Sequence, residues 1–226
     1  GKPLLFVHVP KTGGTTVEDD LRTLGYDVGR FFPWPSDTTA PRCFPWHVPP
    51  RYFYSLDFRD FVTFTVVRDP IDRFFSEFNW QNKRSVTPRD FLRRHPRVRL
   101  PHIGHSRLNV TGYELSSESF CHFLPQTDFL FDALGNRVEH VFTTTTLAAD
   151  LEAFIARYHL REGGHSGNHS QSPSSSPPPK LPPRSNPSPT SRFSRQNASD
   201  DDLDHIRDYY AQDFALLPTF LGRPFP

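Results

Sequence analysis

The beginning of this chain joins an apolar run directly to a glycine-containing loop. Residues 4–9 are apolar except for His8, which is typical of a parallel strand that is buried on both faces. Residues 10–16 follow at once and contain a lysine, two glycines and three threonines. A helix is expected next, because Val17, Leu21 and Leu24 recur at helical spacing. The chain therefore opens with one strand, loop and helix unit.

The same unit recurs at residues 61–78. An apolar run over residues 61–67 ends at Arg68, Asp69 can cap a helix, and Pro70 fits its first turn. The spacing i, i+3, i+4, i+7 predicts the buried face of that helix. This face consists of Ile71, Phe74, Phe75 and Phe78.

A third unit is expected at residues 138–158. Residues 138–142 predict a strand, and the helix after it has a regular apolar face. That face consists of Leu147, Leu151, Phe154, Ile155 and Tyr158. Repeated strand and helix units predict an α/β fold with a parallel central sheet flanked by helices.

A polar stretch interrupts the chain before its C-terminal end. Residues 161–199 are rich in Ser, Pro, Gly and Asn and lack apolar periodicity, which predicts a disordered insert. Order should return at Ser199, as the cap of one final helix with three aspartates in its first turn. Its apolar stripe consists of Leu203, Ile206, Tyr210, Phe214 and Leu217. Residues 1–160 and 200–226 are therefore expected to form a single domain.

Composition limits the classes of function. A net charge of +1 argues against binding of nucleic acid through overall basicity. No apolar run approaches the roughly 20 residues that span a bilayer. The Gly1 start and the absence of methionine favour a fragment whose membrane anchor, if it has one, lies outside. Cys43 and Cys121 allow a single bridge, which leaves the compartment open, and sequons at Asn109, Asn168 and Asn197 fit a secretory glycoprotein.

The loop after the first strand has the features of an anion site. Free backbone N–H groups and a helix N-terminus favour a phosphate or sulfate there. The expected contact residues are Lys11, Thr12, Gly13, Gly14, Thr15 and Thr16. A Walker A loop is excluded because its lysine follows the second glycine, whereas Lys11 precedes both. A tight turn that merely uses glycine is the alternative, and the lysine and threonines count against it.

The end of the second strand offers another anion contact. Arg68 lies where ligands of open parallel sheets collect, and a guanidinium can hold a phosphate at two points. Ser76 on the next helix is adjacent to the core position Phe75 and can line the same site. The alternatives are a surface ion pair of Arg68 with a nearby aspartate and a Ser76 without a role.

Residues 8–16 and 65–78 together resemble two motifs of the Golgi-type carbohydrate sulfotransferases and their bacterial and algal relatives. Weaker similarity covers residues 125–130 and 209–214. The resemblance implies a P-loop NTPase-like sulfotransferase fold and the donor 3'-phosphoadenosine 5'-phosphosulfate (PAPS). It further implies that Lys11 assists departure of the sulfuryl group, while Arg68 and Ser76 bind the 3'-phosphate. The insert departs from the family pattern, so contacts to adenine cannot be transferred from relatives.

His47 is the expected general base, because histidine has a pKa near the working pH and relatives place a catalytic histidine in a comparable loop. A loop histidine without a role is the alternative. His8 competes with it, but a residue in a buried strand is more typical of a satisfied core group. The resemblance also allows a glutamate as the base, but no single glutamate of this sequence is placed well enough to be named. No metal-ligand spacing occurs, so no metal is expected.

A cluster of positive charge points to the acceptor. Its members are Lys83, Arg84, Arg89, Arg93, Arg94, Arg97 and Arg99. Such a surface can bind an acidic polysaccharide, although a solvated helix face explains it equally well. The resemblance implies a carbohydrate acceptor and, in a eukaryote, a membrane-anchored enzyme of the Golgi lumen. A nucleotide kinase and a catalytically inactive glycan-binding module are the competing hypotheses.

Overall fold

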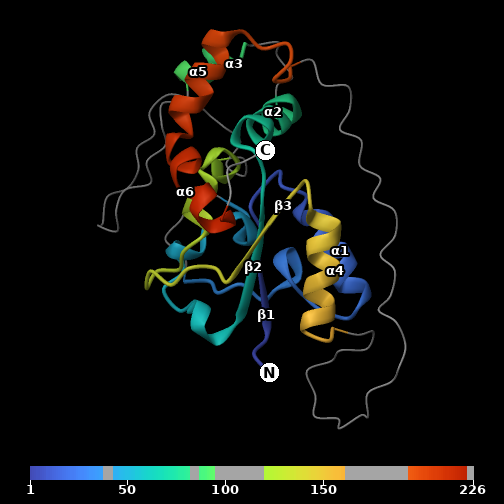
Figure 1. The fold of residues 1–226 in the computed structure, drawn as a ribbon. Coiled ribbons are helices and arrows are strands. Elements are labelled where there is room, and N and C mark those ends of the chain that lie inside the picture. The colour runs from blue at the N-terminus through green and yellow to red at the C-terminus, as the bar shows by residue number, and fades with distance from the viewer. Residues whose placement is uncertain (38–42, 82–86, 95–119, 161–192, 223–226) are drawn as a thin grey trace.

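A parallel sheet forms the centre of the computed structural model, which describes residues 1–37, 43–81, 87–94, 120–160 and 193–222 (Figure 1). Within these residues the sheet has three strands in the order β1 (Leu4–Val7), β2 (Val62–Val67) and β3 (His140–Thr143). Phe6 is paired with Phe64, and Val66 with Phe142. The predicted α/β architecture with a parallel sheet is confirmed.

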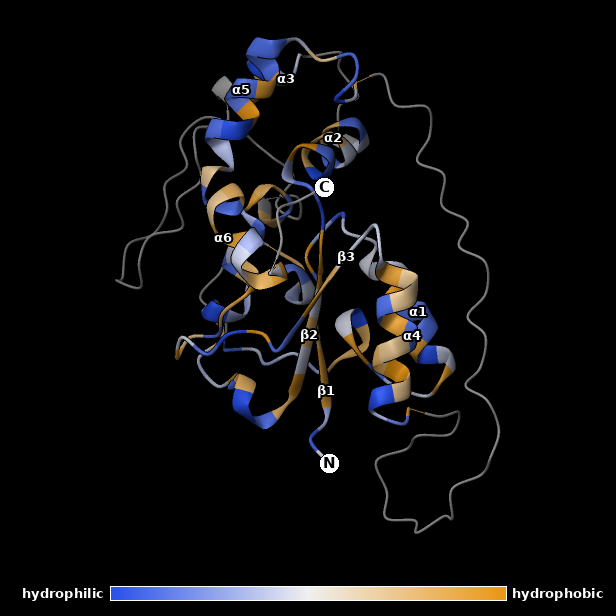
Figure 2. Ribbon diagram, in the orientation of Figure 1, coloured by the Kyte–Doolittle hydropathy of each residue, from blue (hydrophilic) through white to orange (hydrophobic). Residues whose placement is uncertain are grey.

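The two faces of the sheet bury different parts of the chain. Helices α1 (Gly14–Thr23) and α4 (Leu147–Arg157) cover the face that carries Phe6, Phe64 and Phe142. Leu5 and Val7 point to the other face, where helix α6 (Ala211–Leu221) and a series of short segments pack. Figures 1 and 2 show α1 and α4 on one side of the strands and α6 on the other, with apolar residues along the strands.

The predicted helix faces are confirmed. Val17, Leu21 and Leu24 of the first unit are buried. In the third unit Tyr158 is half-buried, and the other four predicted residues of that face are buried. Helix α2 (Pro70–Gln81) begins as expected, because Asp69 Oδ1 accepts hydrogen bonds from the backbone N–H groups of Ile71 at 2.9 Å and Asp72 at 3.0 Å.

A third layer lies beyond the carboxyl ends of the strands (Figure 1). It consists of α2, α3 (Pro88–Arg94) and α5 (Asp200–Tyr209), which pack around Phe74, Phe78 and Ile206. The connecting 3-10 helices are Gly29–Phe31, Pro45–His47, Pro50–Tyr52, Phe58–Asp60, Phe120–Phe123 and Gln126–Phe129.

The single final helix that the sequence predicted is two helices. Ser199 caps α5 as expected, by accepting the backbone N–H of Asp202, but the helix ends at Tyr210, which has φ −103° and ψ 26°. The buried hydroxyl of Tyr210 donates to the carbonyl of Phe123 at 3.1 Å. The break lets one apolar stripe enter two cores, because Ile206 packs in the third layer and Leu217 packs against the sheet.

The end of the expected insert is part of the fold. Asn79 on α2 donates from Nδ2 to the carbonyl of Phe193 at 2.7 Å, and the Phe193 ring packs on Phe78 with centroids 5.3 Å apart. The described chain therefore resumes at Phe193 and not at Ser199, while residues 161–192 lie outside the described residues.

Cys43 and Cys121 form a disulfide with their Cα atoms 6.0 Å apart. The bridge settles the pairing that the sequence left open, and it joins the loop that carries His47 to the 3-10 helix that carries His122. Across the described ranges, no helix combines the length and apolar character needed to cross a membrane.

Reduction of this disulfide should destabilise the protein, because the bridge joins residues 78 positions apart. Removal of a native disulfide typically costs about 2–5 kcal/mol of the free energy of unfolding. Urea unfolding with and without dithiothreitol measures the effect. The matched control is the double variant Cys43→Ser/Cys121→Ser, which should not respond to the reductant. An equal response of parent and control would contradict a structural role of the bridge.

Candidate donor pocket and transfer site

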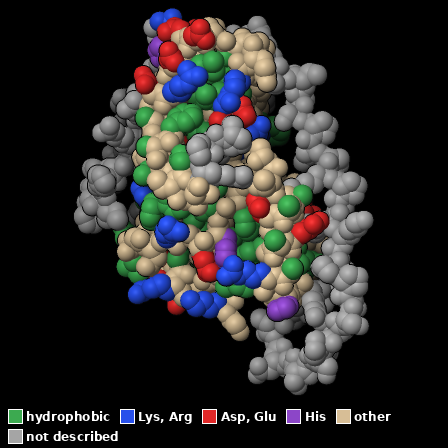
Figure 3. Space-filling view, in the orientation of Figure 1, with side chains coloured by type: hydrophobic (Ala, Val, Ile, Leu, Met, Phe, Trp, Pro, Cys, Tyr) green, Lys and Arg blue, Asp and Glu red, His purple; other side chains and the backbone are tan. Residues whose placement is uncertain are grey.

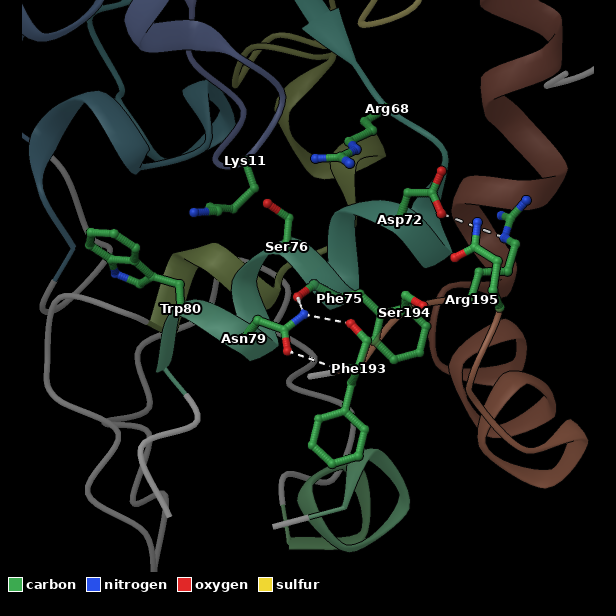
Figure 4. A pocket seen from close by; sticks show the side chains of 11 residues that line it. Lys11, Arg68, Asp72, Phe75, Ser76, Asn79, Trp80, Phe193, Ser194 and Arg195 are labelled. Carbon is green, nitrogen blue, oxygen red and sulfur yellow. Dashed lines mark hydrogen bonds and ion pairs between the residues drawn. The ribbon is translucent and has the colours of Figure 1, made fainter. Parts of the chain in front are cut away.

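A pocket of about 300 Å³ opens at the carboxyl ends of β1 and β2. Its lining residues are Lys11, Arg68, Asp72, Phe75, Ser76, Asn79, Trp80, Phe193, Ser194, Arg195 and Gln196. Figure 4 shows the side chain of Ser76 between those of Lys11 and Arg68. The structure thus brings together three predicted site residues from three elements: the loop after β1, the end of β2 and helix α2.

Arg68 is a half-buried cation without a counter-ion among the described residues. Gln126 fixes its backbone by accepting the N–H of Arg68 at 2.9 Å and donating to its carbonyl at 2.7 Å. Burial lowers the pKa of the guanidinium, although Asp72 and Asp69 act in the opposite direction. Those aspartates pair instead with Arg195, which contacts Asp69 directly and lies 3.6 Å from Asp72. Among the described residues Arg68 therefore forms no salt bridge with Asp69 or Asp72, which was the alternative that the sequence left open.

Lys11 is the second cation that faces the pocket. Its φ of 68° is left-handed, a conformation that costs energy for a residue with a side chain and that is common at functional sites. Burial lowers the pKa of its ammonium group, Glu77 raises it, and Arg68 lowers it further. The ammonium lies 4.8 Å from the centre of the Trp80 ring. No salt bridge to Lys11 occurs within the described part of the chain.

Among the other loop residues, only the Thr12 hydroxyl departs from the expected anion contact. Thr12 is fully buried and its hydroxyl donates to the Val9 carbonyl at 2.8 Å, so this hydroxyl cannot face a ligand as predicted. Gly13 needs its φ of 86° as the residue before α1. At Gly14 a Cβ would lie 2.4 Å from the His8 ring. Thr15 and Thr16 begin α1 and lie outside the pocket lining.

Residues 193–196 line the pocket, although the sequence did not predict them as site residues. They fall at the end of the polar stretch, whose composition masks them. One signal was present, because Phe193 is the single Phe, Tyr or Trp among residues 161–199.

A chain of histidines adjoins Lys11. His47 Nδ1 lies 2.9 Å from His122 Nε2, and His122 Nδ1 lies 3.0 Å from Glu77 Oε1. His8 is buried and its Nδ1 contacts Glu18 Oε1 at 2.6 Å, as expected of a satisfied core residue. Its ring meets that of His47 edge-on, with centroids 4.7 Å apart. Within the described residues no cluster of His, Cys, Asp or Glu is arranged to hold a metal ion.

His47 remains neutral across the physiological range. Burial lowers its pKa to about 2, and His8, His122 and Lys11 act in the same direction. A neutral imidazole offers a lone pair to an incoming proton. The same environment makes the protonated ring unfavourable, so a proton accepted there is poorly held.

The predicted basic cluster is only partly visible. Lys83, Arg84, Arg97 and Arg99 lie outside the described residues. Arg89 on α3 pairs with Asp201 on α5 at 2.6 Å. Figure 3 shows acidic and basic side chains next to one another at the end of the molecule where α3 and α5 lie. The charge of Arg89 is thus engaged within the fold.

The depressed pKa of His47 should make stability depend on pH. In the folded protein the pKa of His47 is about 2, whereas an unfolded histidine has a pKa of about 6.5. As the pH falls below about 6.5, the unfolded state therefore binds a proton at this histidine before the folded state does. Stability present above pH 6.5 is therefore lost as the pH falls. Between pH 7.5 and 5 the parent should lose up to about 2 kcal/mol more than His47→Gln. Urea unfolding at both values tests this, with His205→Gln on α5 as control. Equal losses in parent and His47→Gln would contradict the assignment.

Comparison with known proteins agrees with the geometry. A protein-family model described as the sulfotransferase family matches residues 2–218, which include both anion-contact motifs, α5 and most of α6. Neither curated proteins nor solved structures give a match. Since the family model covers nearly the whole chain, the protein belongs to the sulfotransferase family.

Proposed function

We propose that this protein transfers a sulfuryl group from PAPS to a hydroxyl group of a carbohydrate. The observation that carries the proposal is the pair of cations in one pocket. Lys11 and Arg68 have pKa values lowered by burial, and within the described residues neither forms a salt bridge. Buried charges need a partner, and a donor with phosphate groups at two positions supplies one for each cation.

The two cations are assigned to the two ends of the donor. Lys11 and the start of α1 bind the 5'-phosphosulfate, because a helix N-terminus favours anions. Arg68 and the Ser76 hydroxyl bind the 3'-phosphate. Ser194 and Gln196 add polar side chains along the same lining, where the insert returns to the fold.

The reaction moves one group and one proton. The acceptor oxygen bonds to sulfur while the bond between sulfur and the 5'-phosphate oxygen breaks, and Lys11 stabilises the charge that develops on this oxygen. His47 takes the proton that the acceptor hydroxyl loses. The protein thus contributes position, charge and a base.

Exposed aromatic rings near the transfer point support a carbohydrate acceptor. Phe44 is 37% exposed and stacks on Trp46, with centroids 4.6 Å apart, and both rings adjoin His47. Trp80, 69% exposed, lies beside Lys11. Exposed apolar side chains of this kind mark ligand grooves, and their flat faces suit sugar rings. The disulfide supports an oxidising compartment, for which we propose the Golgi lumen.

Loss of Arg68 should weaken donor binding. Arg68→Ala should bind adenosine 3',5'-bisphosphate roughly 10- to 100-fold more weakly, since a hydrogen bond to a charged group contributes about 1.5–3 kcal/mol. Lys11→Ala should weaken binding less and abolish transfer. Calorimetry measures the affinity, and Arg59→Ala is the matched control because Arg59 pairs with Asp57 at the other end of β2.

A parent protein that does not bind the bisphosphate would overturn the proposal. Preferential binding of ATP with magnesium would favour a nucleotide kinase. Equal losses in Arg68→Ala and Arg59→Ala would show that Arg68 has no specific role.

Acceptor chemistry can be tested by transfer of radiolabelled sulfate to a panel of neutral and acidic polysaccharides. His47→Ala should lower turnover about 10²- to 10⁴-fold, the usual contribution of a general base, and keep its affinity for the bisphosphate. Trp46→Ala should raise the acceptor KM with a smaller effect on kcat. A parent that binds glycans but transfers no sulfate would favour an inactive glycan-binding module.

A further inference from the structure

Two residues connect the proposed base to a buried carboxylate. His122 Nε2 lies 2.9 Å from His47 Nδ1, and its other ring nitrogen lies 3.0 Å from Glu77 Oε1. The side chain of Glu77 is 1% exposed and that of His122 16%. Nε2 of His122 is therefore hydrogen-bonded to the proposed base, whereas Nδ1 lies at ion-pair distance from the carboxylate without a hydrogen bond.

The carboxylate determines where the protons are. An ionised carboxylate only accepts hydrogen bonds, so the Glu77 carboxylate at 3.0 Å favours the tautomer of His122 that carries its hydrogen on Nδ1. In this structure that N–H is close to Oε1 but not aligned with it, which makes the contact electrostatic. Nε2 of a neutral His122 is then an acceptor, so His47 must donate from Nδ1. The lone pair of His47 is thereby placed on Nε2.

We propose that His122 and Glu77 are positioning residues that hold His47 in its reactive tautomer and receive, through it, the proton of the acceptor hydroxyl. This proposal rests on the proposed sulfuryl transfer. As the acceptor oxygen bonds to sulfur, its proton moves to Nε2 of His47, and the proton on Nδ1 moves to Nε2 of His122. One proton enters the chain and one positive charge ends beside Glu77, so the step is balanced.

The surroundings explain why the proton should move on from His47. His8, which follows β1, and Lys11 of the adjoining loop both lie near His47. His47 has a pKa of about 2 and therefore holds a proton poorly. On the far side of His122 the carboxylate of Glu77 on α2 lies 3.0 Å from Nδ1, and the guanidinium of Arg73 contacts the backbone carbonyl of His122. The neighbouring charges therefore oppose a positive charge on His47, while the carboxylate beside His122 attracts one.

One disulfide bond and one hydrogen bond hold this geometry. The neighbouring Cys121 is bonded to Cys43 of the His47 loop, and Arg73 Nη2 donates to the backbone carbonyl of His122 at 2.7 Å. His8 does not provide an equivalent path. Its Nδ1 is committed to Glu18, and its ring meets His47 edge-on at 87°, without a hydrogen bond between these two described residues.

Kinetics of three variants test the proton path. Glu77→Gln and His122→Gln should each lower kcat at least about tenfold, part of the 10²- to 10⁴-fold contribution of a general base. The acceptor KM and the affinity for adenosine 3',5'-bisphosphate should stay within about twofold. The amide of His122→Gln can still accept the Nδ1 hydrogen of His47 but cannot take a proton, which separates holding from receiving. His205→Gln on α5 is the matched control and should behave as the parent.

Histidine tautomers provide a readout that does not need activity. Long-range ¹H–¹⁵N NMR of the parent labelled at histidine should show the hydrogen on Nδ1 of both His47 and His122. A hydrogen on Nε2 of His47 would overturn the proposal, and so would Glu77→Gln and His122→Gln variants that turn over like His205→Gln. A parent that neither binds the bisphosphate nor transfers sulfate would overturn the proposed function instead, and the NMR result would still decide the tautomers.

Discussion

A buried guanidinium holds the transfer site together. Arg73 is 1% exposed, and it donates from Nε to the Pro10 carbonyl at 3.0 Å and from Nη2 to the His122 carbonyl at 2.7 Å. Its guanidinium also lies 5.7 Å from the centre of the Tyr210 ring. Burial raises the pKa of Asp213, and the positive charge of Arg73 acts to lower it. One side chain therefore links the donor loop, the histidine chain and the break between α5 and α6. A buried charge is stable only when such partners are present.

Much of the fold follows from local patterns in the sequence. The strands, the inner faces of α1, α2 and α4 and the caps at Asp69 and Ser199 depend on residues that are close in the chain, and periodicity reveals them. The break at Tyr210 does not, because it depends on a hydrogen bond to Phe123, 87 positions away. Composition likewise concealed the ordered residues from Phe193 onward, since their contacts with α2 reach across 114 positions.

The sequence predicted which residues form the candidate site better than it predicted how their side chains are oriented. Lys11, Arg68 and Ser76 do converge on one pocket, because strand ends of a parallel sheet meet at one edge. The direction of the Thr12 hydroxyl and the need for glycine next to His8 depend on packing that spacing does not encode. Whether Arg68 is paired depended on Arg195, a distant competitor for Asp69. No local pattern in the sequence marked His122, the hydrogen-bond partner of His47.

The disulfide gives the two halves of the site unequal mechanical support. Lys11 and Arg68 follow β1 and β2, Ser76 lies on α2, and the bridge is attached to none of these segments, whereas the His47 loop is covalently attached to the helix of His122. If the protein has the proposed function, folding in a reducing cytosol would leave donor binding largely intact while the acceptor side loses its alignment. Nucleotide affinity alone would be a misleading measure of intact enzyme, because it reports on the half of the site that does not need oxidation.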